Sequence, residues 1–171
     1  MIRKGIQFVP VLLVALLTGL AFAHVLERPA KMLYDAETYT VLQRTLYVAW
    51  GLPNVGGFLE PAAIPATLLL TLAVRKNRPA FWLSLIASIF LLLAFPVVFF
   101  VFVAPANTAF PGAASNNIPI NWVELRASWE TGQSIRIVLQ LTSLALLVSS
   151  ILRRTARSFP RLTFKIPFLV C

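Results

Sequence analysis

Charged side chains are scarce in this chain of 171 residues. Only 12% of the residues are charged and 58% are hydrophobic, whereas a typical soluble domain carries roughly 25% charged residues. So few charges cannot cover the surface of a soluble globule. The scarcity therefore excludes an ordinary soluble domain and favours an integral membrane protein.

Cysteine and histidine each occur once. Cys171 is the last residue, so the chain has no internal disulfide, no redox pair and no prenylation motif. The single histidine, His24, excludes a two-histidine haem site, and His24-x-x-Glu27 is the reverse of the motif that four-helix dimetal proteins carry twice. A single metal held by His24, Glu27 and Glu60 is the alternative, but we expect neither a metal nor another cofactor.

Acidic residues are also few, six against fifteen basic residues, which gives a net charge of +9. In a soluble protein this charge would suggest nucleic-acid binding. Here most basic residues lie in short segments between apolar blocks, and no phosphate loop, nucleotide fingerprint or Ser-His-Asp spacing is evident. We therefore expect the lipid bilayer, and not nucleic acid, as the partner of these charges.

Four apolar blocks are long enough to cross a bilayer, whose core of about 30 Å takes about 20 helical residues. They cover about residues 5–27, 58–74, 80–103 and 122–152. We predict an all-α, four-helix membrane bundle formed by residues 1–152 and a basic tail over residues 153–171. Cleavage of a signal peptide after Ala23 is an alternative, but the first block exceeds the roughly 15 apolar residues of such a segment.

The first connection is predicted to begin at Pro29, which should limit the first helix. In residues 30–48 apolar positions recur at steps of three and four, which indicates an amphipathic helix lying at the membrane interface. The glycines and proline of residues 51–57 indicate a turn.

Residues that predict a bend, a loop and a helix start also occur in the second half of the chain. Pro96 is predicted to bend the third helix, and residues 104–120 are predicted to form a loop. Asn121 followed by Glu124 has the form of a capping box, so the fourth helix should begin at Trp122. Tryptophans near predicted helix ends are typical of interfacial belts: Trp50, Trp82, Trp122 and Trp129.

The charges predict an orientation. The N-terminus, the connection at residues 75–78 and the tail hold ten of the fifteen basic residues and no acidic residue. The positive-inside rule places these segments in the cytoplasm and both chain ends inside a bacterial inner membrane. All six acidic residues lie toward the outer side: Glu27, Asp35, Glu37, Glu60, Glu124 and Glu130.

Polar residues form stripes at helical spacing near that outer side. Such stripes should face the bundle interior or a hydrated cavity, because charges at membrane depth are costly unless paired. The functional interpretation is an outward-facing polar pocket, and the alternative is that the residues pair with one another and only fix helix packing. The first stripe is His24, Glu27, Arg28 and Lys31, and the last is Arg126, Trp129, Glu130, Gln133, Arg136 and Gln140.

Within such a pocket His24 is the candidate proton carrier, with Glu27, Glu60 or Glu130 beside it. Arg136 would hold an anionic group or a carboxylate. The catalytic candidates are therefore His24, Glu27, Glu60 and Arg136. The candidate binding residues are Arg126, Trp129, Glu130 and Gln133.

The sequence resembles the anthrone oxygenase-like family of small four-helix membrane proteins over roughly residues 10–152. The similar segments are His24-Val25-Leu26-Glu27-Arg28-Pro29-Ala30-Lys31, Gln43 to Tyr47, Pro105-Ala106-Asn107 and Trp122…Leu125-Arg126…Trp129-Glu130-x-Gly132…Arg136. The resemblance adds Asn107 to the candidate binding residues. It implies oxygenation of an activated phenolic carbon acid such as an anthrone, without metal or flavin, through a carbanion that reacts with oxygen.

The chain departs from this family at one position. Many members carry a histidine between the helix 4 tryptophan and arginine, where this chain has Gln133. If that histidine is the base, His24 would have to serve here. The alternative from another functional class is a non-catalytic accessory subunit or a binder of a hydrophobic or phenolic molecule.

The orientation generates the first testable prediction. A cysteine introduced at Asn116 should react with a membrane-impermeant maleimide in intact cells, whereas one at Asn77 should react only after permeabilisation. The reverse labelling pattern would place the polar pocket on the cytoplasmic side.

Overall fold

The structure is a computed structural model that describes residues 2–110 and 118–156, with side chains for residues 7–110 and 118–153. Within these residues every regular element is a helix and none is a strand. Four helical runs are long and apolar enough to cross a membrane. They are Gln7–Lys31, Val55–Ala73, Arg78–Ala109 and Trp122–Arg153. The chain is therefore an all-helical, multi-pass bundle.

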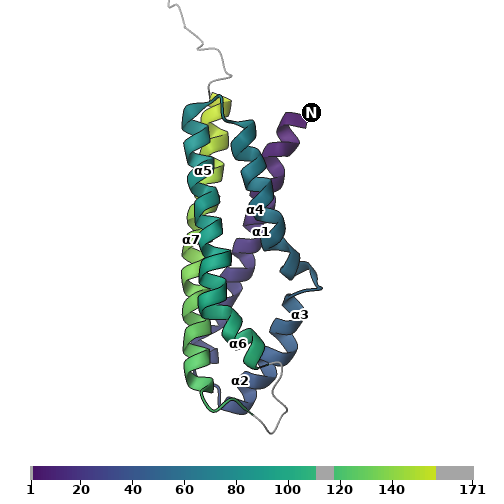
Figure 1. The fold of residues 1–171 in the computed structure, drawn as a ribbon, viewed down its shortest axis with the longest axis vertical. Helices are drawn as coiled ribbons and strands as arrows, with labels where there is room; N and C mark the ends of the chain where they lie inside the picture. The colour runs from purple at the N-terminus through teal and green to yellow at the C-terminus, as the bar shows by residue number, and fades with distance from the viewer. Residues whose placement is uncertain (1, 111–117, 157–171) are drawn as a thin grey trace, which may run out of the picture.

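The long helices run up and down the molecule (Figure 1). The start of α1, the α4–α5 connection and the end of α7 lie at the upper end of Figure 1, and α2, α6 and the start of α7 lie at the lower end. The first two long helices are α1 (Ile2–Lys31) and α4 (Val55–Ala73), joined through α2 (Ala36–Leu42), the π-helix η1 (Gln43–Tyr47) and α3 (Val48–Trp50). The third run is α5 (Arg78–Leu92), the π-helix η2 (Leu93–Val103) and α6 (Ala104–Ala109), and the fourth is α7 (Trp122–Ala156).

Small residues allow α5 and α7 to pack closely in the upper half. Ser143 and Ser150 of α7 donate hydrogen bonds to the carbonyls of Ala87 and Ala80, at 3.0 and 2.9 Å. Thr71 of α4 and Ser88 of α5 are hydrogen-bonded at 3.3 Å. Small and hydroxyl residues commonly form helix contacts in membranes, where apolar surface alone does not drive association.

The lower half has a different construction because α4 is short. Its 19 residues extend about 28 Å, whereas the 35 residues of α7 extend about 52 Å at 1.5 Å per residue. The segment from α2 to α3 occupies the space below α4 (Figure 1). Its Tyr39 and Tyr47 share an apolar cluster with Val103, Phe110 and Trp129.

Several predicted boundaries need correction. The first helix does not stop at Pro29 but continues to Lys31, because a proline in the last turn removes few helical hydrogen bonds. Residues 104–109 are helical and not a loop, since Pro105 occupies the first turn, where its missing N–H has no partner to lose. The fourth helix begins at Trp122 as predicted but extends past residue 152 to Ala156.

The first connection also differs in detail. Helix α2 begins after Asp35, whose carboxylate accepts a hydrogen bond from the Thr38 amide at 2.8 Å. Hydrogen bonding with Thr38 holds the pKa of Asp35 below its usual range. Gly56 and Gly57 belong to the first turn of α4 and not to a turn before it. Asn116, Cys171 and the tail beyond residue 156 lie outside the described residues.

The predicted bend at Pro96 takes the form of a π-helix. Pro96 lies inside η2, which covers eleven residues. Proline has no N–H to donate, and its ring crowds the preceding turn. The helix therefore widens locally, and its hydrogen bonds join residues five apart instead of four. The end of the widened segment, at Phe102 and Val103, packs against Gly132 of α7.

Gly132 gives the second prediction. A Cβ at this position would lie 2.7 Å from the Phe102 Cβ and 2.8 Å from the Val103 Cγ2, so α7 approaches η2 more closely than alanine permits. We predict that Gly132→Ala lowers the free energy of unfolding in detergent by about 1–3 kcal/mol. Gly19→Ala is the control, because open space surrounds Gly19 within the described part of the chain. Equal stability of the two variants would contradict this packing.

Candidate functional site

A cavity of about 120 Å³ lies in the lower half, where α1, the α3–α4 connection, η2 and α7 meet. Its wall combines apolar, aromatic and charged side chains from segments that are distant in the sequence. The residues that define it are His24, Tyr47, Trp50, Glu60, Phe99, Asn107, Trp129, Gln133 and Arg136.

A buried ion pair forms one side of the cavity. The Arg136 guanidinium donates to Glu60 at 2.5 Å and to the Gln133 side chain at 2.9 Å, and Gln140 also donates to Glu60, at 3.2 Å. Arg136 lies over the Phe99 ring, 5.5 Å from its centroid. The ion pair therefore joins α4 to α7 and faces an aromatic ring.

Aromatic rings surround His24 on the other side. The imidazole centroid lies 4.8 Å from the Tyr47 ring, 5.0 Å from the Trp50 ring and 4.9 Å from the Trp129 ring. The Trp129 ring is fixed by its own hydrogen bond, from Nε1 to the Asn107 Oδ1 at 2.9 Å. The site thus places the only histidine of the chain inside an aromatic enclosure contributed by α1, η1, α3 and α7.

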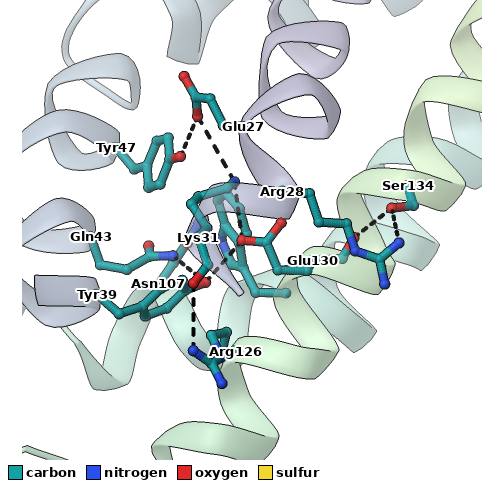
Figure 2. A network of polar contacts seen from close by, with 11 residues as sticks. Glu27, Arg28, Lys31, Tyr39, Gln43, Tyr47, Asn107, Arg126, Glu130 and Ser134 are labelled. Atoms are coloured by element: carbon teal, nitrogen blue, oxygen red, sulfur yellow. Dashed lines mark hydrogen bonds and ion pairs between the residues drawn. The ribbon is translucent and has the colours of Figure 1, made fainter. Parts of the chain in front are cut away.

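A second polar cluster, centred on Lys31, adjoins the cavity at Tyr47 and Asn107 (Figure 2). Lys31 and Glu130 are each 1% exposed and form an ion pair at 3.0 Å. The Lys31 ammonium also lies over the Trp129 ring, 4.6 Å from its centroid, and 3.9 Å from a Glu27 oxygen. Lys31 therefore links the acidic residues to the aromatic enclosure through charge and cation–π contacts.

The α2–η1 face completes this cluster. Tyr39 donates to Glu130 at 3.3 Å and accepts from Gln43 at 3.0 Å, while Tyr47 donates to Glu27 at 2.5 Å. Burial, together with the hydrogen bond to Glu27, raises the pKa of Tyr47 well above its usual value. Burial and the charge of Glu130 raise the pKa of Tyr39 in the same direction. Both phenols are therefore fixed as neutral donors.

Two polar atoms of the cavity residues are buried without a hydrogen-bond partner among the described residues. They are Nδ1 of His24 and Nε of Arg136. Buried polar atoms in proteins are nearly always paired, and exceptions point to water, an ion or a ligand. Two residues that line the cavity therefore carry an unpaired polar atom, an imidazole nitrogen in His24 and a guanidinium N–H in Arg136.

The size of the cavity limits what it can hold. A cavity of roughly 150 Å³ holds one benzene ring, so the 120 Å³ here corresponds to less than one full ring when nothing moves. An adjoining hollow of about 220 Å³ shares Tyr47, Gly51 and Asn107 with it. A ligand of one full ring therefore requires cavity side chains to move, and the adjoining hollow beyond Asn107 provides further space.

The structure brings together six of the nine sequence-derived site residues at the cavity wall. These are His24, Glu60, Asn107, Trp129, Gln133 and Arg136. Glu27 and Glu130 lie in the neighbouring Lys31 cluster. Arg126 lies at the edge of that cluster: it donates to the Tyr34 carbonyl at 2.9 Å and to the Lys31 carbonyl at 3.5 Å, and so caps the end of α1.

Two expectations about individual residues are corrected. Trp129 faces the bundle interior and not the lipid, since it is 1% exposed and enclosed by rings. The first stripe also divides, because Arg28 points away from the Lys31 cluster toward Ser134 (Figure 2).

The sequence pattern assigned no role to Tyr39 and Gln43, and it placed Lys31 in the first polar stripe without a named partner. The signal for the first two was their spacing with Tyr47, because residues four apart share one face of a helix.

The metal alternative does not match the geometry. Within the described residues, no group of three or more histidine, cysteine, aspartate or glutamate side chains lies close enough to hold a metal ion. Glu60 is directed at Arg136, and Glu27 accepts from Tyr47. The two carboxylates thus belong to separate clusters.

Comparison with known proteins adds no assignment. No family model matches the chain, and neither a curated protein nor a solved structure gives a match.

The buried ion pair gives the third prediction. Lys31→Met leaves the Glu130 carboxylate buried without its cation, so we predict a loss of about 3–5 kcal/mol in the free energy of unfolding. The double variant Lys31→Met/Glu130→Gln removes both charges and should lose less than the sum of the two single variants. Additive losses, measured by unfolding in mixed micelles, would show that the two charges do not interact.

Proposed function

We propose that this chain is an inner-membrane protein of the anthrone oxygenase-like kind that binds a small phenolic molecule in the His24 cavity. The observation that carries this proposal is the unpaired His24 Nδ1 inside an aromatic enclosure that also contains the Glu60–Arg136 pair. Flat aromatic ligands stack on such rings. The unpaired Arg136 N–H offers a donor to a phenolic or carbonyl oxygen.

The proposed orientation places both chain ends in the cytoplasm and the cavity toward the outer side. It is supported by the basic residues of the upper end, Arg75, Lys76 and Arg78, and by the acidic residues of the lower half. Polar groups of the upper-half interior are serine and threonine hydroxyls bonded to carbonyls or to one another. A polar route through both leaflets, which a transporter needs, has no support in this arrangement.

The proposed reaction uses His24 as a base. A methylene C–H bond of an anthrone-type substrate breaks, its proton goes to the imidazole, and the electron pair stays on the carbon. Molecular oxygen adds to that carbon, and the imidazolium returns its proton to the resulting peroxide. Loss of the second methylene proton with cleavage of the O–O bond then releases water and leaves a carbonyl. One oxygen atom ends in the ketone and the other in water, so oxygen is the oxidant and no cofactor takes part. Arg136 would stabilise the enolate oxygen that shares the negative charge.

This proposal gives the fourth prediction, which uses dithranol, an anthrone that oxidises slowly by itself in air. The purified protein in nanodiscs should accelerate oxygen uptake and anthraquinone formation. His24→Phe keeps an aromatic ring but removes the base, so the acceleration should fall by about 10²–10⁴-fold. Trp82→Phe is the matched control, because Trp82 is exposed near the start of α5 and does not line the cavity.

The outcomes separate the functional classes. If His24→Phe is as active as the parent protein, His24 is not the base. If the parent protein binds phenol or dithranol in equilibrium dialysis but does not accelerate the reaction, the chain is a non-catalytic binder. If it does neither, the cavity does not serve phenolic ligands.

A further inference from the structure

A second site lies on the outside of the bundle, between α1 and α7. Here Arg28, Thr131 and Ser134 form the polar end of an open groove of about 330 Å³, and Ile135, Val138 and Leu139 continue it along α7. These residues do not line the His24 cavity. The groove therefore belongs to a separate face of the molecule.

Arg28 is the unusual member of this groove. Its guanidinium has five N–H donors, and its one hydrogen bond given by the structure is from Nη1 to the Ser134 hydroxyl, at 3.3 Å. Ser134 in turn donates to the Glu130 carbonyl at 2.8 Å, which orients the hydroxyl toward Arg28. Figure 2 shows the side chain directed away from the Lys31 cluster.

No salt bridge joins Arg28 to a carboxylate within the described residues, although the charge of Glu130 lies near enough to interact with it. Glu27 and Glu130 are the nearest acidic residues along α1 and α7, and both are engaged by Lys31, at 3.9 and 3.0 Å. Arg28 also lies within a run that is apolar enough to cross the membrane. A cation in this position needs an anion or water, because an unpaired charge at membrane depth is costly.

The groove has the dimensions of a lipid site. From Thr131 to Leu139 α7 rises about 12 Å at 1.5 Å per residue, close to the roughly 15 Å that one leaflet of the hydrocarbon core occupies. Arg28 and Thr131 at its polar end offer hydrogen-bond donors, and the side chains along its length are apolar. Phosphate suits the first part because arginine binds it through several N–H groups, and an acyl chain suits the second.

We infer that this groove binds one anionic glycerophospholipid of the adjacent leaflet, with its phosphate on the Arg28 guanidinium and the Thr131 hydroxyl. One acyl chain lies along Ile135, Val138 and Leu139. The site is independent of the proposed reaction at His24, since it shares no lining residue with that cavity.

Native mass spectrometry of the purified protein with dioleoyl phosphatidylglycerol tests this site. The parent protein should retain one lipid more strongly than Arg28→Gln, by about five-fold or more. Arg44→Gln is the matched control, because it removes an equal charge from η1, outside the groove. The Arg44→Gln variant should retain the lipid within about two-fold of the parent protein. Equal losses in both variants would mean that general attraction to the charged protein explains retention, and would overturn the site.

Two further measurements test whether the bound phosphate belongs to a lipid and whether the apolar part of the groove holds its acyl chain. Inorganic phosphate should not displace the lipid, and dioleoylglycerol, which lacks phosphate, should not bind in its place. Val138→Trp fills the apolar part while it leaves Arg28 intact, so it should also lower retention. Displacement by phosphate alone, or full retention by Val138→Trp, would contradict a lipid with its chain in this groove.

Discussion

The Lys31–Glu130 ion pair is the interaction on which the lower half of the bundle depends. Both side chains are 1% exposed, and charges buried to this degree are stable only when their partners are held in place. The pair fixes the end of α1 against α7, and Tyr39 adds the α2 helix through its hydrogen bond to Glu130. Three segments that are far apart in the sequence thus meet around one neutralised charge pair.

The cavity follows from this arrangement. Lys31 holds the Trp129 ring by a cation–π contact at 4.6 Å, and Trp129 with Tyr47 encloses His24. The short α4 brings Glu60 to the same height on the opposite side, where Arg136 neutralises it. The two ion pairs therefore bracket an aromatic space whose histidine keeps one nitrogen unpaired.

The four membrane helices were predictable because hydropathy and length are properties of continuous segments. The interior position of Glu60 and Arg136 was predictable as well, since the cost of a charge in lipid leaves few other places for it. The pairing of Glu60 with Arg136 was not, because it joins residues 76 positions apart through the relative rotation of two helices. Trp129 was assigned both to an interfacial belt and to the pocket, because tryptophan suits both places and only packing distinguishes them.

The most direct measurement of the central claim is nitrogen-15 NMR of the histidine side chain. The chain has one histidine, so each imidazole nitrogen signal reports on His24 alone. With phenol as the ligand, the account predicts a saturable change in the His24 signals in the parent protein. In a Trp129→Ala variant the aromatic enclosure is open, so the same titration should change the His24 signals far less. His24 signals that do not respond while phenol binds elsewhere would contradict a ligand site at this histidine.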